Sequence, residues 1–438
     1  MRLAEIISIS LFVAGLLICV ISGANILFAL AFGLITFTCY ALYKKHSVKE
    51  ILGMMKEGIA AYKNILIIFM FIGMLTAVWR CAGTIPYIIY NAVGFIDPRF
   101  MVLSSFLLCS LMSVLTGTSF GTAGTMGVIC MMISRSLGIN PVLAGGAILA
   151  GAFFGDRCSP MSTSAMLVCA LTDTEIYKNI SNMIKTSIIP LVLTCIIYGL
   201  AGIGASGQAD VKQTVALFAE HFDLSAITAL PALLIVILLI ARVKVKWAMF
   251  SSVIIACVIA AHIQGVGFSE LLKIIVFGFK SSNIELAALL NGGGLVSMIR
   301  VSLIITISAT YSGIFKHTPL LQGIKSIVQK WADILTPFGT VAVVSVFMSM
   351  ISCNQTLATT LTHQTTKELI PDKYEMAVAL ENTSIVIAPL IPWSIAGAVP
   401  LSTIGAPISG MAAAVYLYLI PICCWIAAIA KKRMKKAK

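Results

Sequence analysis

The amino-acid sequence predicts an all-α polytopic membrane protein with about eleven or twelve transmembrane segments, arranged as two inverted repeats with broken or re-entrant helices. Three observations predict this class: the scarcity of charge, the succession of long apolar runs, and a similar polar interruption in each half of the chain. Of the 438 residues, 59% are hydrophobic and 11% are charged, and the mean hydropathy is +1.01. A soluble protein carries about 25% charged residues because its surface faces water. The composition therefore argues against a soluble enzyme, a nucleic-acid-binding domain or a disordered scaffold.

The apolar runs define the expected spans, because a helix needs about 20 mostly apolar residues to cross the hydrocarbon layer. No charged residue occurs from Ile6 to Tyr43, a length that accommodates two spans with a turn near Ser22–Asn25. Further spans are predicted near 64–82, 100–116, 141–155, 187–204, 225–241, 247–264, 295–314, 334–352, 377–393 and 410–430. No soluble domain of useful size fits between these segments.

The positions of the basic residues predict the orientation of the chain. Much of the net charge of +13 lies in the 44–63 connection, in the 242–246 turn and in the tail at 431–438. Cytoplasmic segments of membrane proteins are enriched in Lys and Arg, so we expect both termini on the cytoplasmic side of the cell membrane. The 205–224 stretch is polar and balanced in charge, which suits an external connector. This distribution accounts for the basic charge without nucleic acid as a partner.

The N-terminus and the cysteines predict no processing and no metal centre. No small-residue cleavage site follows the first apolar run, so it is expected to be a retained span rather than a signal peptide. The twelve cysteines lie mostly inside apolar runs, with no CxxC pair and no Cys/His ligand spacing, and are expected to be free thiols. No cofactor is predicted apart from Na+ as a candidate ligand. Membrane lipids are expected partners, and a homodimer is a candidate assembly.

The two halves of the chain have a similar layout. Polar breaks at 116–125 and at 352–360 are each followed by a pair of prolines that flank a span. The amphipathic stretches 47–64 and 268–283 also correspond, and the charge distribution places them on opposite sides of the membrane. We therefore predict two inverted halves with the substrate site at the midplane where they meet. The predicted division is a first half over 1–204, the connector at 205–224, a second half over 225–430 and the basic tail at 431–438.

The first break contains three glycines and five hydroxyl side chains within ten residues. An unwound stretch persists in a membrane only where it is buried in protein or lines water. Its carbonyls and hydroxyls can then replace the hydration shell of a small cation, and the candidate ligands are Thr118, Ser119 and Thr122. The alternative is a helix-packing face, because Gly117 and Gly121 have the GxxxG spacing.

Asp156 is the only acidic residue between positions 101 and 172. Ionisable residues at membrane depth are costly and mark functional sites, so Asp156 is the first candidate for a carboxylate that coordinates a cation or carries a proton. The alternatives are an ion pair with the neighbouring Arg157 and a position at the interface where both face water. Ser159, Ser162, Thr163 and Ser164 add hydroxyls around the helix-breaking Pro160, and the first three of them are further candidate ligands.

The second half offers amide, hydroxyl and carboxyl groups in corresponding segments. The candidates are Asn354, Gln355 and Thr356 in the break, and Glu381, Asn382 and Thr383 in a later span. Glu381 is the last acidic residue of the chain, and its neighbours supply oxygens of the kind that hard cations prefer. The alternative is a carboxylate at a helix N-terminus near the interface, stabilised by the helix dipole.

These segments resemble the NhaC-type sodium/proton antiporter family of the ion transporter superfamily. The resemblance rests on TGTSFGTAGT at 116–125, GAFFGDRCSP at 151–160, LLNGGGLVSM at 289–298 and LEN with APLIPW at 380–393. It implies a secondary transporter of the cytoplasmic membrane, built from two inverted halves with broken helices, that exchanges Na+ for H+. Some similar proteins move organic anions or amino acids coupled to these ions.

Two departures from the family pattern leave the transported solute open. The family has an acidic residue at the positions that Thr163 and Asn382 occupy here. Fewer carboxylates weaken the binding of a desolvated cation. A neutral, hydroxyl- and amide-rich site also suits an amino acid or a small organic anion coupled to Na+ or H+, with Arg157 pairing with its carboxylate.

A channel and an intramembrane aspartyl protease are two further classes. Two dissimilar breaks within one chain favour alternating access over a channel, which usually assembles a ring of identical subunits. A protease would need a second aspartate facing Asp156, and the other aspartates lie beside turn prolines or among polar loop residues.

Overall fold

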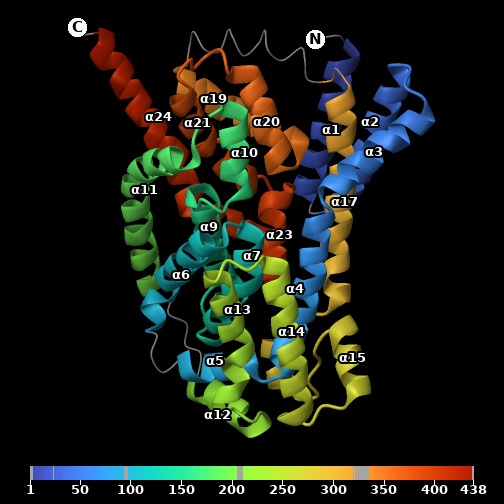
Figure 1. The fold of residues 1–438 in the computed structure, drawn as a ribbon, viewed down its shortest axis with the longest axis vertical. Helices are drawn as coiled ribbons and strands as arrows, with labels where there is room; N and C mark the ends of the chain where they lie inside the picture. The colour runs from blue at the N-terminus through green and yellow to red at the C-terminus, as the bar shows by residue number, and fades with distance from the viewer. Residues whose placement is uncertain are drawn as a thin grey trace.

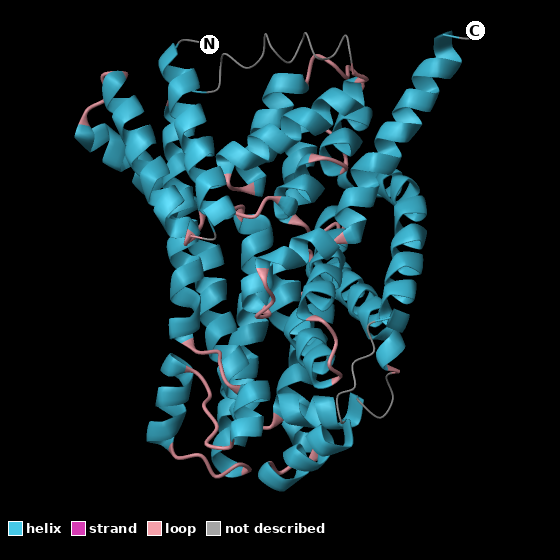
Figure 2. Ribbon diagram, turned by 180° about the vertical axis from the view of Figure 1, so that it is seen from behind, coloured by secondary structure: helices cyan, strands magenta, loops and turns pink. Residues whose placement is uncertain are grey.

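The structure is a computed structural model that describes residues 3–22, 24–92, 97–204, 211–318, 320 and 335–436. The described residues are predominantly helical, and among them the β contact is an isolated bridge between Phe279 and Gly292 (Figure 2). The helices of the first half are α1 (Leu3–Ser22), α2 (Ile26–Tyr43), α3 (Val48–Ala61), α4 (Lys63–Cys81), α5 (Thr84–Ala92), α6 (Met101–Thr116), α7 (Ser119–Thr122), α8 (Val128–Ser136), α9 (Pro141–Cys158), α10 (Thr163–Thr172) and α11 (Ile176–Gly204). Those of the second half (Figure 1) are α12 (Val211–His221), α13 (Leu230–Ile240), α14 (Val245–His262), α15 (Phe268–Phe277), α16 (Ile284–Leu290), α17 (Ile299–His317), α19 (Pro337–Ser352), α20 (Gln355–Thr366), α21 (Lys373–Glu381), α22 (Ser384–Ile387), α23 (Ile395–Thr403) and α24 (Val415–Lys436).

The helices confirm an all-α protein that crosses the membrane several times. Six of the described helices are long and apolar enough to span a membrane, or up to eight if each of two bent helix pairs counts as one span. The predicted eleven or twelve spans are reached only if the four shorter apolar helices, α1, α10, α13 and α19, also enter the membrane. The turn predicted near Ser22–Asn25 lies between α1 and α2. Large apolar side chains such as Ile21 and Leu200 are exposed, as lipid contact requires.

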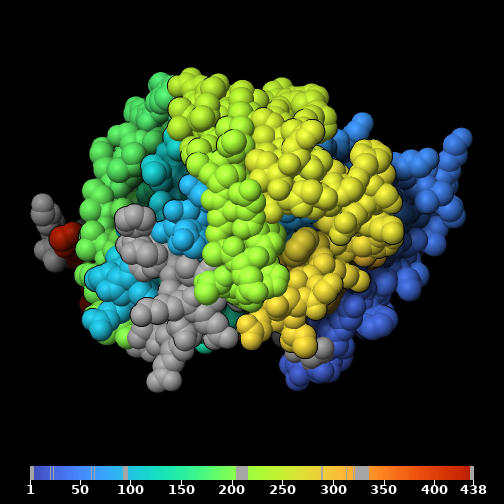
Figure 3. All heavy atoms as spheres, turned by 90° about the horizontal axis from the view of Figure 1, so that it is seen from below, coloured from blue at the N-terminus to red at the C-terminus, as the bar shows by residue number. Residues whose placement is uncertain are grey.

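The start of α1 and the end of α24 lie at the same end of the molecule (Figure 1). The connection from α2 to α3 lies at this end as well, whereas α12 and α15 lie at the opposite end. Seen from that opposite end, the region of α12 to α15 covers much of the surface (Figure 3). The basic turn at 242–246 joins α13, which has only 11 residues, to α14 about halfway along the molecule. It therefore does not lie at the end that carries the termini, where the charge pattern predicts it.

Helices from the two halves of the chain pack against each other. α3 of the first half packs on α17 of the second, and α15 of the second half packs on α4 of the first. α3 lies toward the end that carries the termini and α15 at the other (Figure 1), the relation that the charge pattern predicts for 47–64 and 268–283. The division of the chain into halves stays a prediction. Residues 205–210 of the connector and 437–438 of the tail lie outside the described residues.

The two predicted breaks have nearly the same backbone conformation. The residues that follow α6 and α19, Gly117 and Cys353, are left-handed, with φ of 64° and 55°. The next residues, Thr118 (φ −150°, ψ 127°) and Asn354 (φ −156°, ψ 131°), are extended and cap the following helix. Each capping side chain accepts a hydrogen bond from the backbone N–H three residues further on, which satisfies a donor that the helix start leaves unpaired.

A second set of helix caps also recurs in the same order. Asn140 caps α9 and Asp372 caps α21, and after the next span Ser162 caps α10 and Ser394 caps α23. Each of these side chains accepts a hydrogen bond from the backbone N–H two residues on. The caps fix where each helix begins.

Candidate ion-binding site

Asp156 lies in the last turn of α9 and is only 3% exposed. Its carboxylate accepts hydrogen bonds from Ser162 Oγ at 3.3 Å, from Ser164 Oγ at 3.1 Å and from Gln355 Nε2 at 3.4 Å. The backbone of Ser119 also hydrogen-bonds to this carboxylate. The donors come from the starts of α7 and α20 and from the cap and first turn of α10, so helix starts from both halves converge on one buried carboxylate.

The local sequence around Pro160 brings the serines back to Asp156. α9 ends at Cys158, and the cap formed by Ser162 starts α10 after a short turn. Ser162 Oγ also donates to the backbone carbonyl of Asp156, which ties the new helix to the last turn of the old one. Ser164 lies 3.3 Å from Gln355 Oε1, which links the first half to the second break. The predicted breaks at 116–125 and 352–360 therefore meet at Asp156.

Arg157 points away from Asp156 although the two residues are neighbours. Successive side chains on a helix are rotated by about 100°, so they face different surroundings. The guanidinium is fully buried and donates to Asn382 Oδ1 from Nε at 3.0 Å and from Nη2 at 2.5 Å. Its other partners are Ser187 (2.5 Å), Tyr416 (3.2 Å), Thr186 (3.0 Å), the carbonyl of Met183 (3.1 Å) and the sulfur of Cys158 (3.3 Å). Among the described residues Arg157 forms no salt bridge, neither with Asp156 nor with another carboxylate.

This environment defines the role of Arg157 in the present conformation. The guanidinium has five N–H donors, and its hydrogen bonds to the residues named above already exceed that number. It therefore has no spare donor for the carboxylate of a solute. The charge nevertheless stays buried among neutral partners, which is unusual because buried charges are normally paired.

Asn382 accepts two hydrogen bonds from Arg157. The Nδ2 group of Asn382 donates to Thr186 Oγ1 at 3.3 Å and to Cys424 Sγ at 3.2 Å. The amide is thus satisfied on both sides, and an aspartate here would lose the donors while gaining an ion pair with the guanidinium. The sequence predicts Asn382 as an ion ligand, whereas the structure engages it with Arg157.

Glu381 is 1% exposed, and its Oε2 has no hydrogen-bond partner among the described residues. Both Arg157 and Asp156 are near enough to act on it electrostatically. Glu381 is the last residue of α21, so the alternative of a carboxylate at a helix N-terminus near the interface is wrong. The Nδ2 group of Asn354 is a second buried polar atom without a described partner. Such groups are rare in folded proteins and indicate a site for water or an ion.

The remaining predicted residues fall into two groups. The hydroxyls of Thr122, Ser159 and Thr383 donate to nearby backbone carbonyls, those of Thr118, Val114 and Ala379. Thr163 and Thr356 are exposed and are not among the hydrogen-bond partners of Asp156.

The sequence-based ligand candidates omit several residues that form the site. Ser164 is among the hydroxyls noted around Pro160 but not among the candidate ligands, and the structure shows that it contacts Asp156 directly. Tyr416, Ser187 and Thr186 hold Arg157 from α24 and α11. They have no local sequence signal, because they lie 29 to 259 residues away along the chain.

The fold and the site together define a class of protein: a multi-pass membrane transporter with buried ionisable groups at helix breaks. The chain belongs to the Na+/H+ antiporter family, whose model matches residues 1–170 and 151–430. This confirms the family predicted from the sequence motifs, and the family is one of transporters.

Several curated relatives match most of the chain at modest identity. The Na+/H+ antiporter NhaC of Alkalihalophilus pseudofirmus is 28% identical over 378 residues, covering 84% of this chain and 82% of the relative. The malate-2H+/Na+-lactate antiporter of Bacillus subtilis is 28% identical over 363 residues, 80% of this chain and 77% of the relative. The arginine/ornithine antiporter ArcD of Halobacterium salinarum is 28% identical over 362 residues, 78% of this chain and 73% of the relative.

Proposed function

We propose that this protein exchanges Na+ for H+ across the cytoplasmic membrane, and that Asp156 binds the two ions in competition. The observation that carries the proposal is the convergence of three side chains and one backbone group on this buried carboxylate. A hydroxyl or amide can either donate to a carboxylate or offer oxygen lone pairs to a cation. Ser162, Ser164 and Gln355 are therefore suited to both states of Asp156.

The exchange cycle follows from these groups. With Na+ bound, Asp156 is ionised, and the hydroxyl oxygens of Ser162 and Ser164 turn toward the cation. With H+ bound, Asp156 is neutral and donates its own proton to a neighbouring oxygen. Because one carboxylate cannot hold both ions, binding of one requires release of the other. Glu381 is the second carboxylate, and its unpaired oxygen is available to a proton or a water molecule.

We further infer two inverted halves that alternate access to this site, with both termini in the cytoplasm. The repeated breaks at Thr118 and Asn354 and the opposite placement of α3 and α15 support this inference. Transporters built from inverted repeats bind their substrates near the midplane, where the broken helices meet. Residues 1–204 and 225–430 are the proposed halves.

Everted membrane vesicles test the exchange directly. An imposed pH gradient is followed with a fluorescent amine, and added Na+ should dissipate it in the wild type. Asp156→Asn should insert normally and show no response to Na+. The matched control is Asp173→Asn, because the Asp173 side chain is 99% exposed and pairs with Lys373 at the surface. A normal Na+ response in Asp156→Asn would falsify the assignment.

A second candidate function is the coupled transport of an amino acid or a small organic anion. The observation that favours it is the buried guanidinium of Arg157, whose described partners are all neutral. The names of the relatives from Bacillus subtilis and Halobacterium salinarum also include organic solutes. Proteoliposomes that accumulate labelled solute while Na+ leaves the pH gradient intact would support this function and refute simple exchange.

A further inference from the structure

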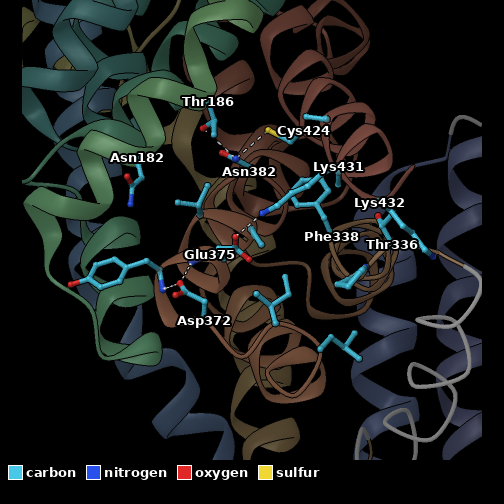
Figure 4. A pocket seen from close by; sticks show the side chains of 18 of the residues that line it. Asn182, Thr186, Thr336, Phe338, Asp372, Glu375, Asn382, Cys424, Lys431 and Lys432 are labelled. Carbon is cyan, nitrogen blue, oxygen red and sulfur yellow. Dashed lines mark hydrogen bonds and ion pairs between the residues drawn. The ribbon is translucent and has the colours of Figure 1, made fainter. Parts of the chain in front are cut away.

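A pocket of about 950 Å³ lies between α11, α19, α21 and α24 (Figure 4). Asn382, Thr186 and Cys424 are part of its lining, so the residues that surround the amide of Asn382 are reached from this space. Asn382 in turn accepts two hydrogen bonds from Arg157. The pocket is therefore separated from the buried guanidinium by one neutral side chain.

The walls of the pocket are predominantly apolar. They are formed by Phe338, Leu369, Ile370, Val378, Ala379 and Ala427. Pockets of about 300 to 1,000 Å³ with apolar walls and a few polar groups are typical of small-molecule sites. A bare cation such as Na+ needs closely spaced oxygens instead, so this space does not suit the exchanged ion.

The charged residues of the lining leave an excess of positive charge. Lys431 pairs with Glu375 at 3.0 Å, and Asp372 accepts hydrogen bonds from backbone N–H groups as the cap of α21. Lys185 and Lys432 also line the pocket and have no ion-pair partner among the described residues. Together with Arg157 behind Asn382, these lysines make the pocket complementary to an anion.

We propose that this pocket binds an organic anion with an apolar body, of the class of medium-chain monocarboxylates. The carboxylate is attracted by Lys185, Lys432 and the field of Arg157, and the carbon chain contacts the apolar walls. This proposal deepens the solute-transport candidate: it gives the solute a site separate from the Asp156 cluster and rests on the chain being a transporter.

Cys424 provides a direct readout of occupancy. The purified full-length protein is placed in nanodiscs of phosphatidylcholine and treated with N-ethylmaleimide, with or without hexanoate. Labelling of Cys424 is quantified by peptide mass spectrometry, and the adjacent Cys423, which does not line the pocket, is the internal control. Hexanoate at millimolar concentration should slow the labelling of Cys424 about fivefold or more and leave Cys423 unchanged.

Two pairs of variants test the stated chemistry. Lys185→Gln combined with Lys432→Gln should weaken protection by hexanoate about tenfold, whereas Lys49→Gln, on α3 outside the pocket, should not. Ala427→Trp should fill the pocket and abolish protection, whereas Ala430→Trp, on the same helix but outside the lining, should preserve it.

Several outcomes would overturn the proposal. These are no protection by hexanoate, equal protection by butylammonium, or protection that persists in Ala427→Trp. Protection produced by phosphatidylglycerol nanodiscs without hexanoate would assign the pocket to an anionic lipid instead. The Na+ response of the same variants is measured separately in vesicles. If the wild-type protein shows no Na+ response, Na+/H+ exchange is refuted, whereas the pocket assignment still depends on the protection of Cys424 alone.

Discussion

Replacing Gly117 by alanine tests whether the first break positions the serines around Asp156. Gly117 has φ of 64°, and a Cβ atom there would lie 2.5 Å from the carbonyl carbon and 2.7 Å from the oxygen of Met161. Neither group can move without moving the backbone that leads into Ser162. The left-handed conformation costs an alanine about 1 to 2 kcal/mol, and overpacking costs about 1 to 3 kcal/mol.

We therefore expect Gly117→Ala to destabilise the protein by about 3 kcal/mol, which for a chain of this length lowers Tm by about 3 °C. The displaced serines should also weaken Na+ binding, so the Na+ concentration for half-maximal response should rise about fivefold. Thermal unfolding of the purified protein and the vesicle assay measure the two effects.

Gly53→Ala is the matched control, because Gly53 lies inside α3 and an added Cβ would have no neighbour within 4 Å. It should be neutral or stabilise the helix by up to about 1 kcal/mol. If Gly117→Ala behaves like Gly53→Ala in both Tm and Na+ response, the close approach of the break to residue 161 does not control the site.

Three further substitutions separate the roles of the buried polar groups. Ser164→Ala removes one donor to Asp156 but no helix cap, so the Na+ concentration for half-maximal response should rise about fivefold with little change in Tm. Ser162→Ala should weaken the response in the same way and also destabilise the protein by about 1 kcal/mol, because Ser162 caps α10. Asn382→Asp should form an ion pair with Arg157 and reduce protection of Cys424 by hexanoate, and unchanged protection would argue against the field of Arg157 as an attractant. Glu381→Gln removes a charge but no described hydrogen bond, so it should fold with an unchanged Tm and slow the Na+-dependent proton flux, and an unaltered flux would remove Glu381 from the cycle.

The sequence predicted the parts of the site that depend on local chemistry. The breaks after α6 and α19 were recognisable because glycine, hydroxyl and amide residues interrupt apolar runs, and these residues cap the next helices. Asp156 was recognisable because a lone acidic residue in a long apolar context needs compensating donors. The expectation of an inverted repeat placed the site where the two halves meet but left open whether the two breaks contact each other, which the structure shows at Asp156.

The features that the sequence did not predict depend on directions in three dimensions. An ion pair with Arg157 was one alternative to a functional role for Asp156, but the helical rotation between neighbours turns the two side chains toward different helices. Besides Asn382 and Cys158, the partners of Arg157 come from α11 and α24, whose sequences have the apolar composition of ordinary membrane spans. The interpretation of Glu381 as a carboxylate at a helix N-terminus was wrong because Asp372 caps that helix nine residues earlier, which leaves Glu381 at its C-terminal end.

The divergence of Asp156 and Arg157 suggests how a cation and an anion could be coupled in one transporter. Asp156 faces the starts of α7, α10 and α20, whereas Arg157 faces α11, α24 and the floor of the pocket. Both side chains belong to the same turn of α9, so a shift of that turn on ion binding moves them together. Neutralising Asp156 with H+ or with Na+ changes the field at Glu381, which also interacts with Arg157. Coupling requires an element whose equilibrium both sites bias, and we propose the last turn of α9 for this role because it carries one ionisable group of each proposed site.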